Sequence, residues 1–186
     1  MEHARRSGFP VPEVREVNGP DMVVARVRGR TMSDDLGRRP WCLGAHARTL
    51  GDLHRRLHAI PAPDGLRAPF GGGEAFLHLD LHPQNVLIGD DGPWVIDWAN
   101  AGVGPAAIDV ALTFVIVGAV PRARSPLQAL VGVLRRRFAI EFLSSADPEG
   151  VHEALAVAID FRLADQNVGP DERDAAEALR ARVLRR

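Results

Sequence analysis

The stretch from residue 76 to residue 98 carries three oxygen-bearing side chains at spacings that suit phosphoryl transfer. Asp80 and Asn85 lie in a polar loop, and Asp97 follows an apolar run. Between Asn85 and Asp97, an Asp-Asp-Gly sequence at 90–92 separates two apolar runs, which is typical of a tight hairpin. We expect this hairpin to bring the three side chains together. One base and two oxygen ligands are what magnesium-dependent phosphoryl transfer requires.

Each of these residues also has a simpler interpretation. Asp80 could bond to its own loop backbone, and Asp97 could be a turn or cap residue. His78, Asp80 and His82 could form a metal cluster of the hydrolase type. The hydrolase interpretation is the weaker one, because no further His, Asp or Glu at ligand spacing supports it.

The residues from 78 to 111 resemble the catalytic core of the aminoglycoside phosphotransferase and choline kinase-like family. The shared elements are His-x-Asp-x-His-Pro-x-Asn-Val-Leu, a short hairpin, Ile-Asp-Trp, and a later Gly-Pro-Ala-Ala-Ile-Asp-Val-Ala. Proteins of this family are small-molecule kinases with a protein-kinase-like fold. The resemblance therefore implies Mg²⁺ and ATP, or another nucleoside triphosphate, as cofactors. It also implies γ-phosphate transfer to a hydroxyl of a small molecule, either aminoglycoside-like or another cationic or polar acceptor.

The resemblance assigns roles to residues of the loop and hairpin. Asp80 would be the catalytic base, with His78 beside it in the catalytic set, and Asn85 and Asp97 would hold Mg²⁺. His82 would support this set. One departure is Leu79, where the family usually has glycine, so that a loop which normally exploits the freedom of glycine carries a side chain here.

Two further segments acquire roles from the same resemblance. Asp109, on the first turn of a buried helix, would brace the catalytic loop from below. Residues 25–28 would be the hinge between lobes, with the backbone of Arg26 and Val27 against adenine. We therefore expect an α+β fold: a protein-kinase-like C-terminal lobe, mostly helical with a small catalytic hairpin, plus a remnant of the N-lobe strands and hinge. The division would be 1–30 for that remnant and 31–186 for the helical lobe, as one structural unit.

The family normally has several dozen residues before this point, so we expect an N-terminally truncated member. The 23 basic residues are all Arg, and the sequence contains no Lys. Kinases of this fold hold the α- and β-phosphates with a Lys on an N-lobe strand, and Arg is a wider planar fork rather than a point charge. The alternative function is therefore a non-catalytic, pseudokinase-like remnant that acts as a binding or interaction module.

Periodicity and turn residues predict the remaining elements. An amphipathic helix is expected over 43–60, with His54 and His58 on a solvated or partly buried face; a metal shared by these two is a weaker alternative. The other predictions are a helix ending near Gly8, strands over 14–17 and 22–27, a buried helix over 105–120, helix starts at Ser125-Pro126, Asp147-Pro148 and Gly169-Pro170, and an inward face of Leu127, Leu130, Leu134, Phe138 and Phe142.

Composition narrows the partners of this 186-residue chain. A net charge of −1 gives no reason to expect nucleic acid, and the apolar run 110–120 is too short to cross a membrane. The single Cys42 and an N-terminus without an apolar core favour the cytoplasm. Apolar surface that normally meets the N-lobe favours a homodimer or a partner chain. The acid-rich stretch 147–177 either meets a cationic acceptor or forms a solvated helix face.

Overall fold

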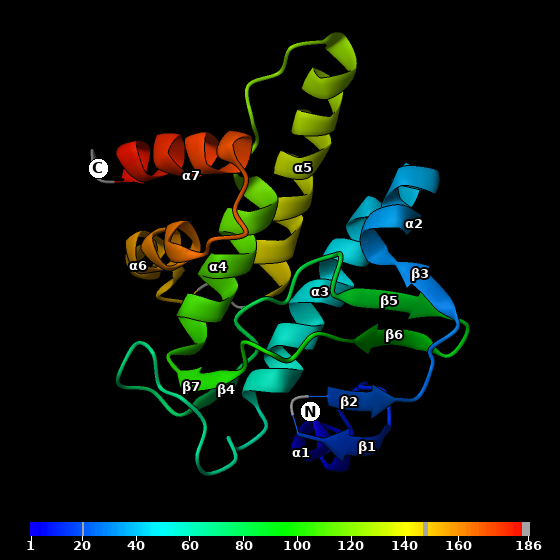
Figure 1. The fold of residues 1–186 in the computed structure, drawn as a ribbon. Coiled ribbons are helices and arrows are strands. Elements are labelled where there is room, and N and C mark those ends of the chain that lie inside the picture. The colour runs from blue at the N-terminus through cyan, green and yellow to red at the C-terminus, as the bar shows by residue number, and fades with distance from the viewer. Residues whose placement is uncertain (20, 147–148, 184–186) are drawn as a thin grey trace.

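The computed structural model describes residues 1–19, 21–146 and 149–183. A group of helices packs beside three small antiparallel sheets (Figure 1). The elements in chain order are α1 (Glu2–Arg6), β1 (Val14–Asn18), β2 (Asp21–Val24), β3 (Gly29–Thr31), α2 (Met32–Arg38), the 3₁₀ turn η1 (Pro40–Cys42), α3 (Leu43–His58), β4 (Ala75–Leu77), β5 (Val86–Gly89), β6 (Gly92–Val95), β7 (Gly102–Gly104), α4 (Ala106–Gly118), α5 (Pro126–Ser145), α6 (Val151–Ala164) and α7 (Pro170–Val183).

The predicted hairpin is the centre of a three-stranded sheet. β5 pairs with β6 from Val86 opposite Val95 to Gly89 opposite Gly92, which confirms the tight turn. β3 adds to the outer edge of β5, and the sequence analysis did not predict it. A second sheet pairs β4 with β7, and the third is the β1–β2 hairpin. In Figure 1 the β1–β2 hairpin lies at the edge of the molecule, beside α1.

The core lies between the long helices. α3 buries Ala47, Leu50 and Leu57 completely, as its amphipathic spacing predicts, and it ends at His58. α4 is apolar on nearly all sides, and it lies between α6 and α5 in the middle of Figure 1. α3 and α4 both pack against β4, the strand that leads into the loop before β5, so their polar side chains can reach that loop.

α5 confirms one prediction and corrects another. Its Ser125 N-cap is confirmed, because the hydroxyl accepts a hydrogen bond from the Gln128 backbone N–H at 3.2 Å. Phe138 and Phe142 are buried as predicted, but Leu127 and Leu130 are 70% and 54% exposed. The first turns of α5 project beyond the other helices in Figure 1, so the apolar face predicted there has no helix to pack against.

Three other predictions have mixed outcomes. The helix end near Gly8 is confirmed, and Gly8 has a positive φ of 77°. The strand predicted over 22–27 is too long, since β2 ends at Val24 and 25–28 form a coil. The helix start proposed at Asp147-Pro148 lies outside the described residues. Within the described part of the chain, no helix is both long and apolar enough to cross a membrane.

Candidate active site

A buried carboxylate fixes the loop that carries Asp80. Asp109 is fully buried, and its Oδ1 accepts a hydrogen bond from the Leu79 backbone N–H at 2.7 Å. Its Oδ2 accepts one from the His78 backbone N–H at 3.2 Å and lies 3.0 Å from Nε2 of His58. Burial alone would raise the pKa of Asp109, but the hydrogen bond from His58 holds it well below its usual range. Asp109 is therefore an anion that binds the loop from below.

A second contact from α4 holds the same loop one turn further along the helix. The Thr113 hydroxyl donates to the Leu81 carbonyl at 2.6 Å. The ring of His54 spans from the Thr113 oxygen, at 3.0 Å from Nε2, to the Leu50 carbonyl, at 2.9 Å from Nδ1. Burial lowers the pKa of His54 to about 4, so the ring is neutral at pH 7. His54, His58 and Thr113 are thus structural partners of the loop.

The sequence analysis missed these partners. It placed His54 and His58 on a solvated or partly buried face, and the structure buries His54 completely. Their four-residue spacing does put both on one side of α3, which is the signal that could have found them. The described residues contain no group of three or more His, Cys, Asp or Glu side chains able to hold a metal. Neither the hydrolase cluster nor a shared histidine metal therefore gains support.

The loop backbone adopts a left-handed conformation at Leu79. Its φ is +62°, a region that favours glycine, and the side chain is only 1% exposed. A residue with a Cβ atom pays roughly 1–2 kcal/mol for this conformation. Asp97 has a similar φ of +60°. Both bends occur where the chain has to turn a functional side chain out of the core.

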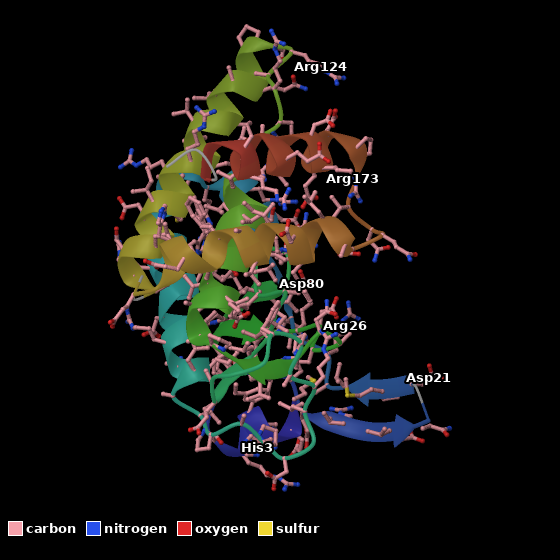
Figure 2. All side chains as sticks on the ribbon, turned by 90° about the vertical axis from the view of Figure 1, so that its left-hand side faces the viewer. His3, Asp21, Arg26, Asp80, Arg124 and Arg173 are labelled. Carbon is pink, nitrogen blue, oxygen red and sulfur yellow. The ribbon has the colours of Figure 1, made fainter. Side chains whose placement is uncertain are left out.

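Asp80 is held by its loop neighbours and remains partly exposed. Its Oδ2 accepts a hydrogen bond from Asn85 Nδ2 at 3.1 Å, and its Oδ1 lies 3.4 Å from His82 Nε2. The Gln84 backbone N–H donates to His82 Nδ1 at 3.3 Å, which leaves Nε2 as the ring nitrogen that faces Asp80. Figure 2 shows Asp80 below α6 and α7, with Arg26 of the coil between β2 and β3 beneath it.

The charge state of Asp80 follows from these contacts. Burial alone would raise its pKa, but the hydrogen bond from His82 lowers it, and the charge of Arg162 adds to this effect. The net result is a lowered pKa. Asp80 is therefore ionised at neutral pH and able to orient and accept the proton of a hydroxyl.

Asn85 and Asp97 present oxygen atoms that suit Mg²⁺. The Asn85 amide donates from Nδ2 to the Asp80 carbonyl at 2.9 Å as well as to its carboxylate, which leaves Oδ1 free of any described partner. Asp97 is exposed and makes no hydrogen bond or ion pair with another described residue. The Ile96 N–H donates to the Asn85 carbonyl at 3.0 Å, so Asn85 and Asp97 flank the base of one hairpin. An amide oxygen and a carboxylate are hard ligands of the kind Mg²⁺ prefers.

His78 has a different environment from the one that a catalytic group needs. The ring is fully buried, donates from Nε2 to the Ile96 carbonyl at 3.1 Å, and lies 4.7 Å from the ring of Trp98. Burial lowers its pKa, so the ring is neutral. A ring without solvent access cannot touch a substrate, so burial argues for a positioning role instead of the expected catalytic one. His78 ties the loop of Asp80 to the strand end that carries Asp97.

The residues expected to contact adenine are exposed or half-buried, whereas a cavity lies on the other side of the Asp80 loop. Arg26 is exposed and Val27 is half-buried in the coil between β2 and β3. On the other side of the loop, a cavity of about 550 Å³ lies between the loop residues 82–84 and helices α2, α4, α5, α6 and α7. Arg135 and Arg162 contribute to its wall, and the sequence analysis did not single out either of them.

Comparison with known proteins agrees with this geometry. Residues 66–143 match the model of the phosphotransferase enzyme family. No curated protein matches the sequence. A choline/ethanolamine kinase family protein from Mesorhizobium loti is similar in structure, with 18% identity and a TM-score of 0.61, over 99% of this chain and 76% of that one. Plasmodium vivax ethanolamine kinase gives 10% identity and a TM-score of 0.51, over 97% and 69% of the two chains. The predicted resemblance and the protein-kinase-like fold are confirmed.

Proposed function

We propose that this chain, whose residues 66–143 match the phosphotransferase enzyme family on a protein-kinase-like fold, is an ATP-dependent small-molecule kinase. It would transfer the γ-phosphate of ATP, or of another nucleoside triphosphate, to a hydroxyl of a polar small molecule. Aminoglycoside-like and other cationic acceptors belong to the class that the family resemblance implies. The family match supports the kinase assignment, whereas the acceptor has to be argued from the cavity.

One observation carries the proposal: Asp80 stays partly exposed beside Asn85, and Asp97 is exposed at the end of the same hairpin, while the backbone of the Asp80 loop is bound from behind. Asp109 takes the N–H groups of residues 78 and 79, so the loop cannot relax toward the core. Asp80 is left ionised and partly exposed, and the side-chain oxygens of Asn85 and Asp97 have no hydrogen-bond or ion-pair partner among the described residues. Pre-organised groups of this kind supply catalysis chiefly by positioning and charge stabilisation.

The residues divide the work of the reaction. Asp80 would orient the acceptor hydroxyl and take its proton as the oxygen attacks the γ-phosphorus. Asn85 and Asp97 would hold Mg²⁺, which, when bound, neutralises charge on the phosphates. His82 donates to Asp80 and keeps its carboxylate aimed, and His78 keeps the loop and the hairpin end together. Arg26 and Val27 would border the adenine through their backbone.

The proposal extends to organisation and setting. We assign residues 1–30 to a remnant of the N-lobe with its hinge, and residues 31–186 to the helical lobe as one unit. The single Cys42 favours action in the reducing cytoplasm. On β1 and β2, Val17 and Val23 are 66% and 52% exposed. Such apolar surface supports a second copy or a partner chain over the nucleotide side.

The test is calorimetric titration of ATP into the chain, once in the presence of Mg²⁺ and once in its absence. We expect binding that requires Mg²⁺ and is lost in Asp97→Asn, because the variant removes one ligand charge at the metal. Asp90→Asn is the matched control, since Asp90 is exposed on the turn of the same hairpin. Absence of heat at millimolar nucleotide would overturn the kinase assignment for this chain and favour the alternative, a non-catalytic binding module.

A further inference from the structure

The cavity beside the catalytic loop is built mainly from apolar side chains. Its volume is about 550 Å³, which is within the range of small-molecule sites. One edge is the loop itself, at His82, whose ring reaches Asp80. Residues of α2, α3, α4 and α5 form the apolar wall. They are Leu36, Leu43, Ile116, Val117, Leu134 and Phe138. A ligand that fills this space therefore needs an apolar body.

Arg162 contributes charge that is already neutralised. Its Nε donates to Glu172 at 2.8 Å, and its Nη1 donates to Asp165 at 3.1 Å. Two carboxylates thus fix this guanidinium at the cavity, on the side of Asp80, whose pKa its charge helps to lower. Arg162 is a fixed wall residue, and Glu172, although it lines the cavity, is already paired.

Arg135 is the cavity arginine that touches no carboxylate among the described residues, although the charge of Glu172 acts on it from a longer distance. Its Nε and Nη2 donate to the carbonyls of Val117 and Ile116, at 3.0 and 2.9 Å. These bonds fix the side chain and use two of its five N–H groups. No carboxylate among the described residues forms an ion pair with Arg135. An immobilised guanidinium with unused N–H groups on an apolar wall is a ready partner for a carboxylate.

The acid-rich C-terminal stretch does not supply an acidic wall to this cavity. Asp160 pairs with Arg180 at 2.8 Å, and Asp171 pairs with Arg124 at 3.1 Å, both at the surface. Glu172 is the one acid of that stretch that lines the cavity within the described chain. A polycationic acceptor would therefore meet Arg135 and Arg162 rather than free carboxylates, which disfavours it.

We propose that the acceptor of this kinase is a hydroxy acid, an alcohol with an apolar body and one carboxylate that Arg135 binds. The inference rests on the proposed function and specifies its substrate class. The acceptor oxygen would form the new P–O bond, the bond from the γ-phosphorus to the ADP oxygen would break, and Asp80 would take the hydroxyl proton. The products are ADP and the phosphorylated hydroxy acid.

Three probes of one size separate charge from shape. 3-Phenyllactate is an anion, 3-phenyllactamide is its neutral amide, and phenylalaninol is a cation with the same ring and a hydroxyl. Each is titrated calorimetrically into the full chain without nucleotide, where fragments of this size bind at about millimolar strength. We expect the anion to bind at least about tenfold tighter than the cation, which corresponds to one charge-assisted contact.

Two variants test whether Arg135 recognises the charge of the ligand. Arg135→Gln should weaken phenyllactate about tenfold and leave phenylalaninol unchanged, while Arg137→Gln, exposed on the same helix, should change neither. Arg135 also bonds the end of α4, so its replacement can disturb folding. Val131→Asp avoids that problem, because Val131 lines the cavity and is 46% exposed. The added carboxylate should weaken the anion and strengthen the cation.

The outcomes separate this inference from the kinase proposal. Equal or tighter binding of the cation or the amide overturns the hydroxy-acid inference, as does no anion binding at tens of millimolar. If MgATP binds but the cation is preferred, the kinase proposal stands and the acceptor class is wrong. If MgATP does not bind while the anion preference depends on Arg135, the kinase proposal fails and the cavity remains an anion-selective site.

Discussion

Leu79 allows the strain in the catalytic loop to be measured. Its left-handed φ of +62° should cost roughly 1–2 kcal/mol for any residue with a Cβ atom. Its side chain is 1% exposed, so Leu79→Ala should lose about 3–5 kcal/mol from the emptied core. Leu79→Gly loses the same side chain but removes the strain, against an entropic cost for glycine of about 0.5–1 kcal/mol. The free energy of unfolding of Leu79→Gly should therefore be higher than that of Leu79→Ala by roughly 0.5–1 kcal/mol.

Leu81 is the matched control two residues further along the loop. It is also fully buried, and its φ is not in the positive range. There, glycine should be less stable than alanine by about 0.5–1 kcal/mol. The glycine-minus-alanine difference at 79 should thus exceed that at 81 by roughly 1.5 kcal/mol. Urea unfolding followed by circular dichroism, with unchanged m values, measures all four variants. Equal differences at the two positions would refute the strain argument.

Three further predictions concern the ties around the loop and one helix end. Asp109→Asn should cost about 3 kcal/mol or more in urea unfolding, because an amide cannot accept all three hydrogen bonds made by the buried carboxylate; a loss below about 1 kcal/mol would contradict this role. The folded-state pKa of His54, about 4, lies below its unfolded value of 6.5. Its stabilising contribution is therefore complete above pH 6.5 and falls by about 3 kcal/mol toward pH 4. Urea titrations at several pH values measure this dependence of the free energy of unfolding on pH, which should be weaker in His54→Gln. Ser125→Ala should lower the free energy of unfolding by about 1 kcal/mol through the lost N-cap, and Ser144→Ala, whose exposed hydroxyl bonds only within the same helix, should be nearly neutral.

Local patterns predicted the elements whose signals lie within a few residues. The turn at 90–92, the amphipathic spacing of α3, and the Ser125-Pro126 start all depend on short-range chemistry, and the structure confirms them. Leu127 and Leu130 have the same periodicity as Phe138, but periodicity does not show where a facing element ends. β3 and β7 were missed because each has three residues, which is too short for alternation to appear.

The candidate site shows the same contrast between short-range patterns, which the sequence displays, and long-range contacts, which it does not. The candidates Asp80, Asn85 and Asp97 came from their order and spacing, and the structure places Asn85 against Asp80 and joins the residue before Asp97 to the Asn85 backbone. His54 and Arg135 were not selected, since their meaning depends on contacts that sequence does not display. The partner of His54, Thr113, is 59 residues away, and Arg135 matters only because a cavity forms beside it.

One helix, α4, connects the Asp80 loop with the wall of the neighbouring cavity, the proposed acceptor site. Asp109 and Thr113 hold the loop, and Ile116 and Val117 line the cavity. With a rise of about 1.5 Å per residue, the first anchor and that wall are roughly 10 Å apart along a rigid rod. A single-residue insertion between them would turn the wall by about 100° away from the loop. The shape of the proposed acceptor cavity is therefore more easily changed by resizing the side chains at 116 and 117 than by changing the length of the helix.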